Sequence, residues 1–415
     1  MKRLALLLLC AQPLFAMDFN DPRALAAAAV DAHPAMARLR AEAAAARERI
    51  ASSDALPNPM LMSGVQNKQV DLRDDPMMTM YMAGVSQTLV RPEKREARRN
   101  AAELMARAAE KQIDATRAEI ERDVFLAWYD LAAADMQLSA VTRVRELLSA
   151  VVDAARVRYE VGTSMQADVI RAQLEASSLE HEVIELRGMR RAALARLLPL
   201  LDLPLATDVP SLAFPEHAGS GTTGTSIAVP DDHPAIAAMQ AEAAAAEADI
   251  RMVELERTPD IELEAQYGYR RIERDMFSLT ARIELPLRAK TNIEPRVREA
   301  IARRDVANAR IAELRRSISA ALAQFVVAHE EATNQLRFHH DVLVPQAQLA
   351  FESSLTAYQT GRTALDAVLA AEAAYLRLQL EAIRFVAEHE QAVASYDALR
   401  RGARPGAGFS TGSMQ

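Results

Sequence analysis

Residues 31–46 read DAHPAMARLRAEAAAA, and this stretch returns at residues 231–246 as DDHPAIAAMQAEAAAA. Eleven of the sixteen aligned positions are identical, at an offset of 200. Further along the chain, Tyr159 and Gly162 correspond to Tyr358 and Gly361 at an offset of 199. A period of this length is too long for a solenoid repeat. The sequence therefore predicts one structural half that occurs twice.

The duplication sets the expected domain organisation. The predicted parts are a first repeat, a linker, a second repeat and a disordered tail, at residues 17–200, 201–230, 231–400 and 401–415. The linker contains a G-x-G-x-x-G pattern at residues 219–224. Because that pattern lies between prolines and opens no helix, we interpret it as linker and not as a phosphate loop.

Composition and the amino terminus limit the class of protein. Half of the residues are apolar, and glycine and aromatic residues are few, which favours long helices. The net charge of −8 argues against a non-specific nucleic-acid binder. Residues 1–16 have the basic start, short apolar run and small-residue end of a secretory signal peptide, and the run is too short for a membrane anchor. The only cysteine, Cys10, lies inside this signal.

Helix signals divide each half in the same way. The first half is predicted to have a helix at residues 22–55 with a restart at His33-Pro34, a very long helix at 93–159 and a third helix at 166–199. Apolar residues along 93–159 recur at the three- and four-residue steps of a coiled coil. The second half copies this with a helix from near Pro295 to 357 and another at 365–400. Two shorter helices placed end to end would match the length of the long one.

Two segments break the helical pattern and are predicted as β-hairpins, at residues 58–90 and 260–287. The residues from Ile261 to Tyr269 alternate between apolar side chains on one face and Glu262, Glu264 and Gln266 on the other. Strands of about ten residues fit a membrane, but four strands cannot close into a barrel alone. The hairpins are therefore either parts of a barrel shared between chains or soluble hairpins packed on the helices.

At this point the chain resembles the TolC-like outer-membrane efflux proteins. The resemblance rests on the two His-Pro helix starts, on hairpins that end in Gln87-Thr88-Leu89 and Glu284-Leu285-Pro286-Leu287, and on the turn at residues 158–169. The segment around residues 75–82, followed by Pro92-Glu93-Lys94-Arg95, is similar to the members associated with metal-ion exporters.

The resemblance implies a mostly helical fold with a small β part. It implies a homotrimer in which three chains share a twelve-stranded outer-membrane β-barrel and an α-helical barrel that reaches into the periplasm. The implied partners are a periplasmic adaptor protein, an inner-membrane pump of the RND type and outer-membrane lipid, with no cofactor and no nucleic acid. The implied adaptor-docking residues lie at the two glycine turns: Tyr159, Gly162, Thr163, Ser164 and Asp168 in the first, and Tyr358, Gly361, Arg362 and Thr363 in the second.

The gate residues depart from the family pattern. The family often has an acidic residue after the second glycine at the position that matches Asp168, whereas this chain has Ala367 there and Asp366 one place earlier. One residue is about 100° around a helix. Asp168 and Asp366 are the gate candidates, but the shift weakens the expectation of an acidic ring from the second repeat.

The methionines of the first hairpin are the candidate metal ligands. Met78, Met80 and Met82 are expected on one face of a strand, with Met60 and Met62 alternating on its partner. Thioethers suit Cu(I) or Ag(I). Lipid-facing packing of flexible side chains is the interpretation that the sequence favours, and a metal path along the lumen is the alternative.

Other chemistry finds little support in the sequence. His329-Glu330-Glu331 and His339-His340-Asp341 lack the full ligand set of a metal site and are interpreted as solvated charge on a coiled coil. No nucleophile elbow, zinc-protease helix or phosphate loop is present, so an enzyme is not expected.

The function predicted from the sequence is the passive exit duct of a tripartite efflux system in the outer membrane, with a large periplasmic part. The expected cargo is a heavy-metal cation such as copper or silver. Efflux of organic compounds and type I protein secretion are the alternatives within the class. A soluble periplasmic coiled-coil scaffold or adaptor is the alternative from another class.

Overall fold

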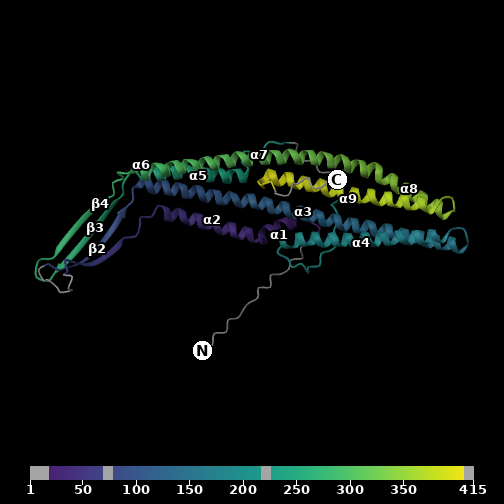
Figure 1. The fold of residues 1–415 in the computed structure, drawn as a ribbon, viewed down its shortest axis with the longest axis horizontal. Helices are drawn as coiled ribbons and strands as arrows, with labels where there is room; N and C mark the ends of the chain where they lie inside the picture. Colours follow the sequence, from purple (N-terminus) through teal and green to yellow (C-terminus); the bar gives the residue numbers. More distant parts are fainter. Residues whose placement is uncertain (1–17, 69–77, 216–225, 406–415) are drawn as a thin grey trace, which may run out of the picture. The chain divides into compact units, whose positions relative to one another are not determined.

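The computed structural model describes residues 18–68, 78–215 and 226–405, which form long helices and one four-stranded sheet (Figure 1). The predicted signal peptide, the glycine-rich pattern at 219–224 and the tail from residue 406 lie outside these residues. The chain divides into two compact units, and each takes segments from both halves of the sequence. The helical unit contains the described residues of 18–36, 116–230 and 318–405, and the sheet unit contains those of 37–115 and 231–317.

The sheet unit is built around four antiparallel strands. They are β1 (Met60–Gln66), β2 (Met80–Leu89), β3 (Ile261–Arg270) and β4 (Met276–Ile283), in the order β1-β2-β3-β4. Both predicted hairpins are therefore confirmed. Pairing of β2 with β3, from Met80 opposite Arg270 to Leu89 opposite Ile261, joins the hairpins of the two sequence halves into one sheet.

The helices that lead into the strands begin at prolines. α1 (Pro22–Ala32) ends before His33, whose ψ of 126° is extended, and α2 (Pro34–Ser53) starts at the next residue. A residue before proline disfavours the helical conformation, so the predicted restart is confirmed and has a local cause. In the second half, α5 (Pro234–Leu255) has 22 residues and is shorter than the helix predicted at the corresponding place of the first half, residues 22–55.

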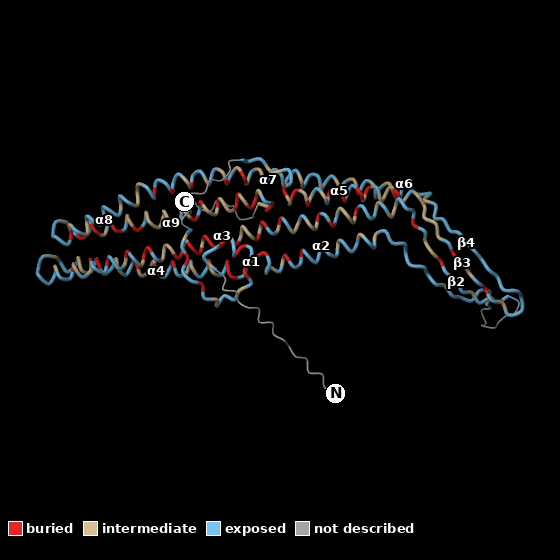
Figure 2. Tube along the Cα trace, turned by 180° about the vertical axis from the view of Figure 1, so that it is seen from behind, coloured by how far each residue is buried: buried red, intermediate tan, exposed pale blue. Residues whose placement is uncertain are grey.

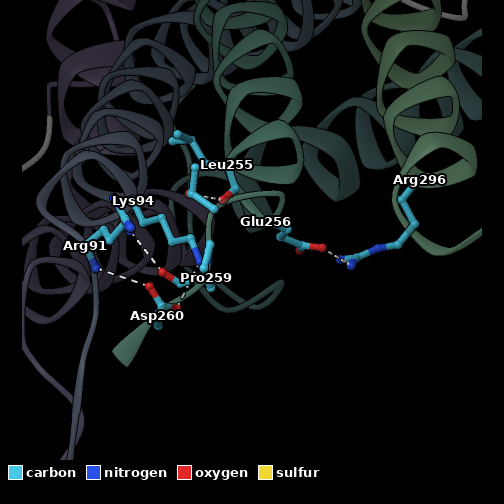
Figure 3. A network of polar contacts seen from close by, with 8 residues as sticks. Arg91, Lys94, Leu255, Glu256, Pro259, Asp260 and Arg296 are labelled. Atoms are coloured by element: carbon cyan, nitrogen blue, oxygen red, sulfur yellow. Dashed lines mark hydrogen bonds and ion pairs between the residues drawn. The ribbon is translucent and has the colours of Figure 1, made fainter. Parts of the chain in front are cut away.

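The base of the sheet is held by polar contacts between the start of α3 and the start of β3 (Figure 3). Asp260 accepts hydrogen bonds from the Arg91 backbone N–H at 3.2 Å and from Lys94 Nζ at 3.0 Å. The Arg91 side chain donates to the Pro259 carbonyl at 2.9 Å, and Arg296 pairs with Glu256 nearby. Asp260 is only partly exposed. Its contacts join the segment between β2 and α3 to the start of β3.

Long helices of the helical unit pack around an apolar core. The helices that form this core are the carboxyl-terminal part of α3 (Pro92–Glu160), α4 (Gln166–Leu200), α8 (Val344–Gln359) and α9 (Leu365–Arg401). The core draws on all four, with members such as Val144, Leu179, Phe351 and Val368. The predicted 93–159 helix is confirmed, and Trp128 is fully buried, with its Nε1 donating to the Phe19 carbonyl at 2.7 Å.

The second long helix differs from the prediction of one α-helix to residue 357. The short α6 (Ala289–Asn292) precedes α7 (Glu294–Phe338), and α7 runs directly into a five-residue π-helix, η1 (His339–Leu343), before α8 begins. Pro345 lies in the first turn of α8 and has no N–H to donate to the preceding turn. Just before Pro345 the backbone hydrogen bonds span five residues, as in a π-helix: the Val344 N–H donates to the His339 carbonyl.

None of the helices within the described residues combines the length and the apolar composition needed to span a membrane.

Candidate functional site

The first glycine turn, between α3 and α4, is a helix stop with a defined hydrogen-bond pattern. The Thr163 N–H donates to the Arg158 carbonyl at 2.8 Å, and the Gly162 N–H donates to the Tyr159 carbonyl at 3.0 Å. Gly162 has a φ of +75°, in the left-handed region. This is a Schellman motif, in which glycine is favoured because it has no Cβ.

The second turn, between α8 and α9, repeats the same backbone 199 residues later. The Arg362 N–H donates to the Ala357 carbonyl at 2.8 Å, the Gly361 N–H donates to the Tyr358 carbonyl at 3.0 Å, and Gly361 has a φ of +77°. The duplication seen in the sequence is therefore reproduced in local geometry.

Asp168 acts locally at the first turn. Its Oδ2 accepts hydrogen bonds from Ser164 Oγ at 2.7 Å and from the Met165 backbone N–H at 3.3 Å. These contacts cap the start of α4, where a negative charge is also favoured by the helix dipole. Of the predicted docking residues here, Tyr159, Gly162 and Thr163 are exposed, and Ser164 and Asp168 are half-buried.

The two turn tyrosines have different surroundings. Tyr159 is 46% exposed, whereas Tyr358 is 2% exposed and belongs to the core of the helical unit. Arg158 links the turns: its guanidinium donates to the Tyr358 carbonyl at 2.8 Å and lies 4.7 Å from the centre of the Tyr358 ring. The predicted equivalence of Tyr159 and Tyr358 thus holds for the backbone and not for the side chains.

A second contact between the turns uses the gate candidate Asp366. Arg171 of α4 donates to the Asp366 carboxylate at 3.0 and 3.3 Å, and both side chains are more than half exposed. Ala367, at the position where the family often has an acid, is exposed. Arg362 is exposed and Thr363 half-buried at the same turn.

The strand registers divide the sheet into an apolar and a polar face. Directly paired residues share a face. The apolar face carries large exposed side chains from all four strands: Leu61, Val65, Tyr81, Val85, Leu263, Tyr267, Tyr269, Phe277, Leu279 and Ile283. The polar face carries Ser86, Thr88, Glu262, Glu264, Gln266 and Arg282. The alternation predicted for the residues from Ile261 to Tyr269 is confirmed.

The methionines Met80 and Met82 lie on the polar face, paired with Arg270 and Gly268. Met78 is an exposed turn residue just before β2, so the prediction that it lies on a strand face with Met80 and Met82 is wrong for this residue. The register opposes the lipid-facing interpretation of the strand methionines, because the large apolar side chains occupy the other face.

Comparisons with known proteins agree with this geometry. Residues 25–201 match the sequence model of the outer membrane efflux protein family. The structure resembles the outer membrane protein VceC of Vibrio cholerae, with a TM-score of 0.75, 20% identity, and coverage of 92% of this chain and 96% of that one. The fold is that of an outer-membrane efflux channel.

Two further solved channels have the same fold. The open state of the Neisseria gonorrhoeae MtrE outer membrane channel matches with a TM-score of 0.76 at 15% identity, covering 92% of this chain and 89% of that one. CusC, a protein described as forming a transmembrane channel, matches with a TM-score of 0.75 at 16% identity and 92% coverage of both chains. No curated protein is similar enough in sequence to be matched.

The efflux-channel fold contains a buried acid that our reading of the sequence missed. Glu372 of α9 is fully buried, and neither carboxylate oxygen has a hydrogen-bond partner within the described part of the chain. It lines a cavity of about 350 Å³ between α3, α4 and α9. Burial, and then the charge of Glu175, raise the pKa of Glu372 from 4.5 to about 7. The sequence feature that could have identified Glu372 is its position as the single acid inside the apolar run from Leu369 to Leu376.

His340 is exposed, as expected, but two other histidines of the second long helix differ from the expectation of solvated charge. His339, in the π-helix, is buried, with its Nδ1 2.9 Å from the Gln335 carbonyl and its Nε2 3.3 Å from Glu381. The rings of His329 and His389 lie 4.5 Å apart, and burial followed by the His389 charge lowers the pKa of His329. No group of three or more His, Cys, Asp or Glu among the described residues could hold a metal ion.

Proposed function

We propose that this chain is the outer-membrane exit duct of a tripartite efflux system and works as a homotrimer. The observation that carries the proposal is the sheet, which has one apolar and one polar face and two strands with a free edge. Within the described residues, β1 pairs only with β2, and β4 only with β3. A soluble scaffold or adaptor would not be expected to expose an apolar face across four strands.

Closure of the sheet requires other copies of the chain. An open edge in lipid leaves backbone groups without hydrogen-bond partners, so a membrane sheet must close. Single-chain barrels begin at about eight strands. Three chains of four strands would give a barrel of about twelve, with the apolar face toward lipid and the polar face toward the lumen. β2 and β3, with ten residues each, have the length of membrane-spanning strands.

The first turn supplies the more suitable surface for an adaptor. Large apolar side chains are exposed in this turn and on both helices beside it: Val157, Tyr159, Val161, Met165, Ile170 and Leu174. Among the described residues from 350 to 376, by contrast, no large apolar side chain is exposed. An exposed apolar patch that faces water marks an interaction site. We assign adaptor docking mainly to the first turn, and closure of the duct to the second.

The contacts of Arg158 with Tyr358 and of Arg171 with Asp366 would hold the duct closed. Opening then requires the two helical hairpins to move apart, which adaptor binding favours if the adaptor binds the open state better. The duct is passive, and an inner-membrane pump of the RND type supplies the energy. Export to the outer membrane would use the signal peptide predicted at residues 1–16.

The proposed cargo is a soft metal cation such as copper or silver, because thioethers lie on the face assigned to the lumen. Organic compounds and secreted proteins are the competing cargoes. A deletion strain would be tested against copper, silver, zinc, cobalt and cadmium salts beside dyes and antibiotics. Selective metal sensitivity, restored by the wild-type chain, supports the metal cargo, and sensitivity to organic compounds alone overturns it.

The membrane assignment is tested by matched substitutions in neighbouring positions of β4. Leu279→Arg places a charge on the apolar face and should prevent assembly in the outer membrane, because arginine at mid-membrane costs about 2–4 kcal/mol on a barrel exterior. Ser278→Arg places the same charge on the polar face and should assemble. Equal behaviour of the two variants in outer-membrane fractionation, or a wild-type chain that leaves with the soluble periplasm, would contradict the proposal.

The turn assignment is tested with Gly162→Pro. Proline cannot adopt the φ of +75° at this position and removes the N–H that bonds to Tyr159. We expect loss of export with the trimeric barrel still assembled. Normal export by this variant would refute the assignment of the turns to docking and gating.

A further inference from the structure

The polar face of the sheet carries more methionines than the first hairpin alone suggested. The registers place five on it: Met60 and Met62 of β1, Met80 and Met82 of β2, and Met276 of β4. Met276 comes from the second half of the sequence, about two hundred residues away. No sequence alignment of the hairpins identifies it as a neighbour of the others, because that depends on the pairing of β2 with β3.

Glycines stand opposite the methionines in this face. Met62 pairs with Gly84, and Met82 pairs with Gly64 on one side and with Gly268 on the other. Met276 also pairs with Gly268. A residue opposite a glycine has no cross-strand side chain to pack against, so its own side chain is free to extend over the neighbouring strand.

Gly268 is the position in the sheet where three methionines come together, Met80 through its side chain and Met82 and Met276 through the strand register. A Cβ added at Gly268 would overlap the Met80 sulfur and lie 2.9 Å from its Cγ, so the Met80 side chain occupies the space above this glycine. Met82 and Met276 flank Gly268 from the two adjacent strands. Adjacent strands are about 4.8 Å apart, and methionine side chains are long and flexible enough to bridge that spacing.

The carboxylates of this face lie further along β3 and are already paired. Arg282 donates to Glu262 at 2.9 Å and to Glu264 at 3.2 Å, and Gln266 donates to Glu264. The charged residue beside the methionines is Arg270, which stands opposite Met80. The carboxylates are therefore engaged by cations of the protein, and the thioethers are the donors without such partners on this part of the face. Hard cations prefer oxygen ligands, whereas soft monovalent cations prefer thioethers.

We propose that Met80, Met82 and Met276 form a transient binding site for Cu(I) or Ag(I) around Gly268, and that Met60 and Met62 extend the row along β1. This inference rests on the proposed function, in which the polar face lines the lumen. Neutral ligands bind a cation without trapping it by charge, and conduction needs sites that release what they bind.

The site is tested on the intact trimer, purified in detergent, with Ag⁺ as a redox-stable probe. Calorimetric titration measures affinity, and X-ray absorption at the silver edge identifies the ligand atoms. The wild-type trimer should bind Ag⁺ with sulfur neighbours. The combined variant Met80→Leu, Met82→Leu, Met276→Leu keeps the side-chain volumes nearly unchanged.

Affinity should fall by at least about tenfold in that variant, since loss of even an outer-shell partner commonly costs ten- to a hundredfold. The control is Met105→Leu with Met189→Leu, two exposed helix methionines outside the sheet, and it should bind Ag⁺ as wild type does. If the combined variant does not assemble, the Ag⁺ affinity of Met82→Leu alone is measured, and it should also be lower than that of the wild type.

In cells, the combined variant should lose silver resistance while retaining trimer assembly. A membrane-inserted wild-type trimer without sulfur-bound Ag⁺, or a combined variant with unchanged affinity, would overturn the site and leave the duct proposal standing. A wild-type chain that forms no membrane trimer would overturn the duct proposal, and the site with it.

Discussion

The two glycine turns of the helical unit have the same backbone and opposite surroundings. Gly162 and Gly361 have φ angles of +75° and +77°, and each turn makes the same pair of hydrogen bonds. Tyr159 is nevertheless 46% exposed, while Tyr358 is buried in the core against Arg158.

The difference between Tyr159 and Tyr358 distinguishes what local sequence determines from what tertiary packing determines. The turn itself is fixed by a glycine and by helix ends, which are local. The exposure of its side chains is fixed by the neighbouring helices, and among the described residues from 350 to 376 no large apolar side chain is exposed. Buried and exposed stretches alternate along the helices (Figure 2). Duplication has thus produced one turn whose tyrosine is exposed and one whose tyrosine is part of the core.

The largest effect is expected from removing the buried tyrosine. Tyr358→Ala should destabilise the helical unit by about 3–5 kcal/mol, as for other large aromatic truncations in a core. Tyr159→Ala should change stability by no more than about 0.5 kcal/mol while impairing adaptor binding. Thermal unfolding of the purified trimers, followed by circular dichroism, measures the stability difference.

The control for this comparison is Tyr358→Phe. The Tyr358 hydroxyl is buried without a partner in the described residues, so its removal should be neutral or stabilising. Equal losses from the two alanine variants would show that trimer assembly buries Tyr159 as well, and the contrast between the turns would fail.

The next effect in size concerns pH and Glu372. Its unfolded pKa is 4.5 and its folded pKa is about 7, raised first by burial. The folded state therefore binds this proton more tightly, so the stability that protonated Glu372 contributes is fully present below about pH 4.5 and is lost as pH rises through about 7. The full loss corresponds to roughly 3 kcal/mol.

Glu372→Gln should abolish this pH dependence in thermal unfolding. The matched control is Gln173→Glu at the repeat-related position of α4, which is exposed and should add no comparable dependence. A wild-type melting temperature that does not change between pH 4.5 and 7.5 would show that Glu372 ionises without cost, and the contrast between the two helices would disappear.

A smaller and equal effect is expected from Gly162→Ala and Gly361→Ala. Nothing lies within 4 Å of a Cβ added at either glycine, so only the backbone conformation should matter. Holding a residue that has a Cβ in the left-handed conformation lowers stability by about 1–2 kcal/mol. Hydrogen exchange at the turns should increase by the same factor in both variants, and unequal increases would mean that the surroundings act on the backbone too.

The smallest effect is expected from Asp366→Ala. The pair with Arg171 is exposed on both sides, and such pairs contribute about 0.2–1 kcal/mol and are screened by salt. Unfolding at low salt should shift slightly, and at high salt it should not shift at all. A large loss that persists at high salt would place Asp366 in a buried contact of the trimer.

The main elements of the fold were predictable because their signals are local. Pro34 starts a helix, Gly162 and Gly361 end helices, and alternation from Ile261 to Tyr269 marks a strand with two faces. Each of these depends on the backbone preferences of a few adjacent residues. The π-helix at His339–Leu343 was missed, because a proline at position 345 in a long apolar pattern permits either a kink or a re-spaced turn.

The sequence by itself determined the duplication, the two hairpins, the glycine turns and the resemblance to outer-membrane efflux proteins. Only the tertiary structure decided that Tyr358 and Glu372 are buried while Tyr159 and Gln173 are exposed. It also decided that Met276 joins Met80 and Met82 on the polar face. These outcomes depend on strand register and on helix packing between residues far apart in the chain, and no local pattern encodes either.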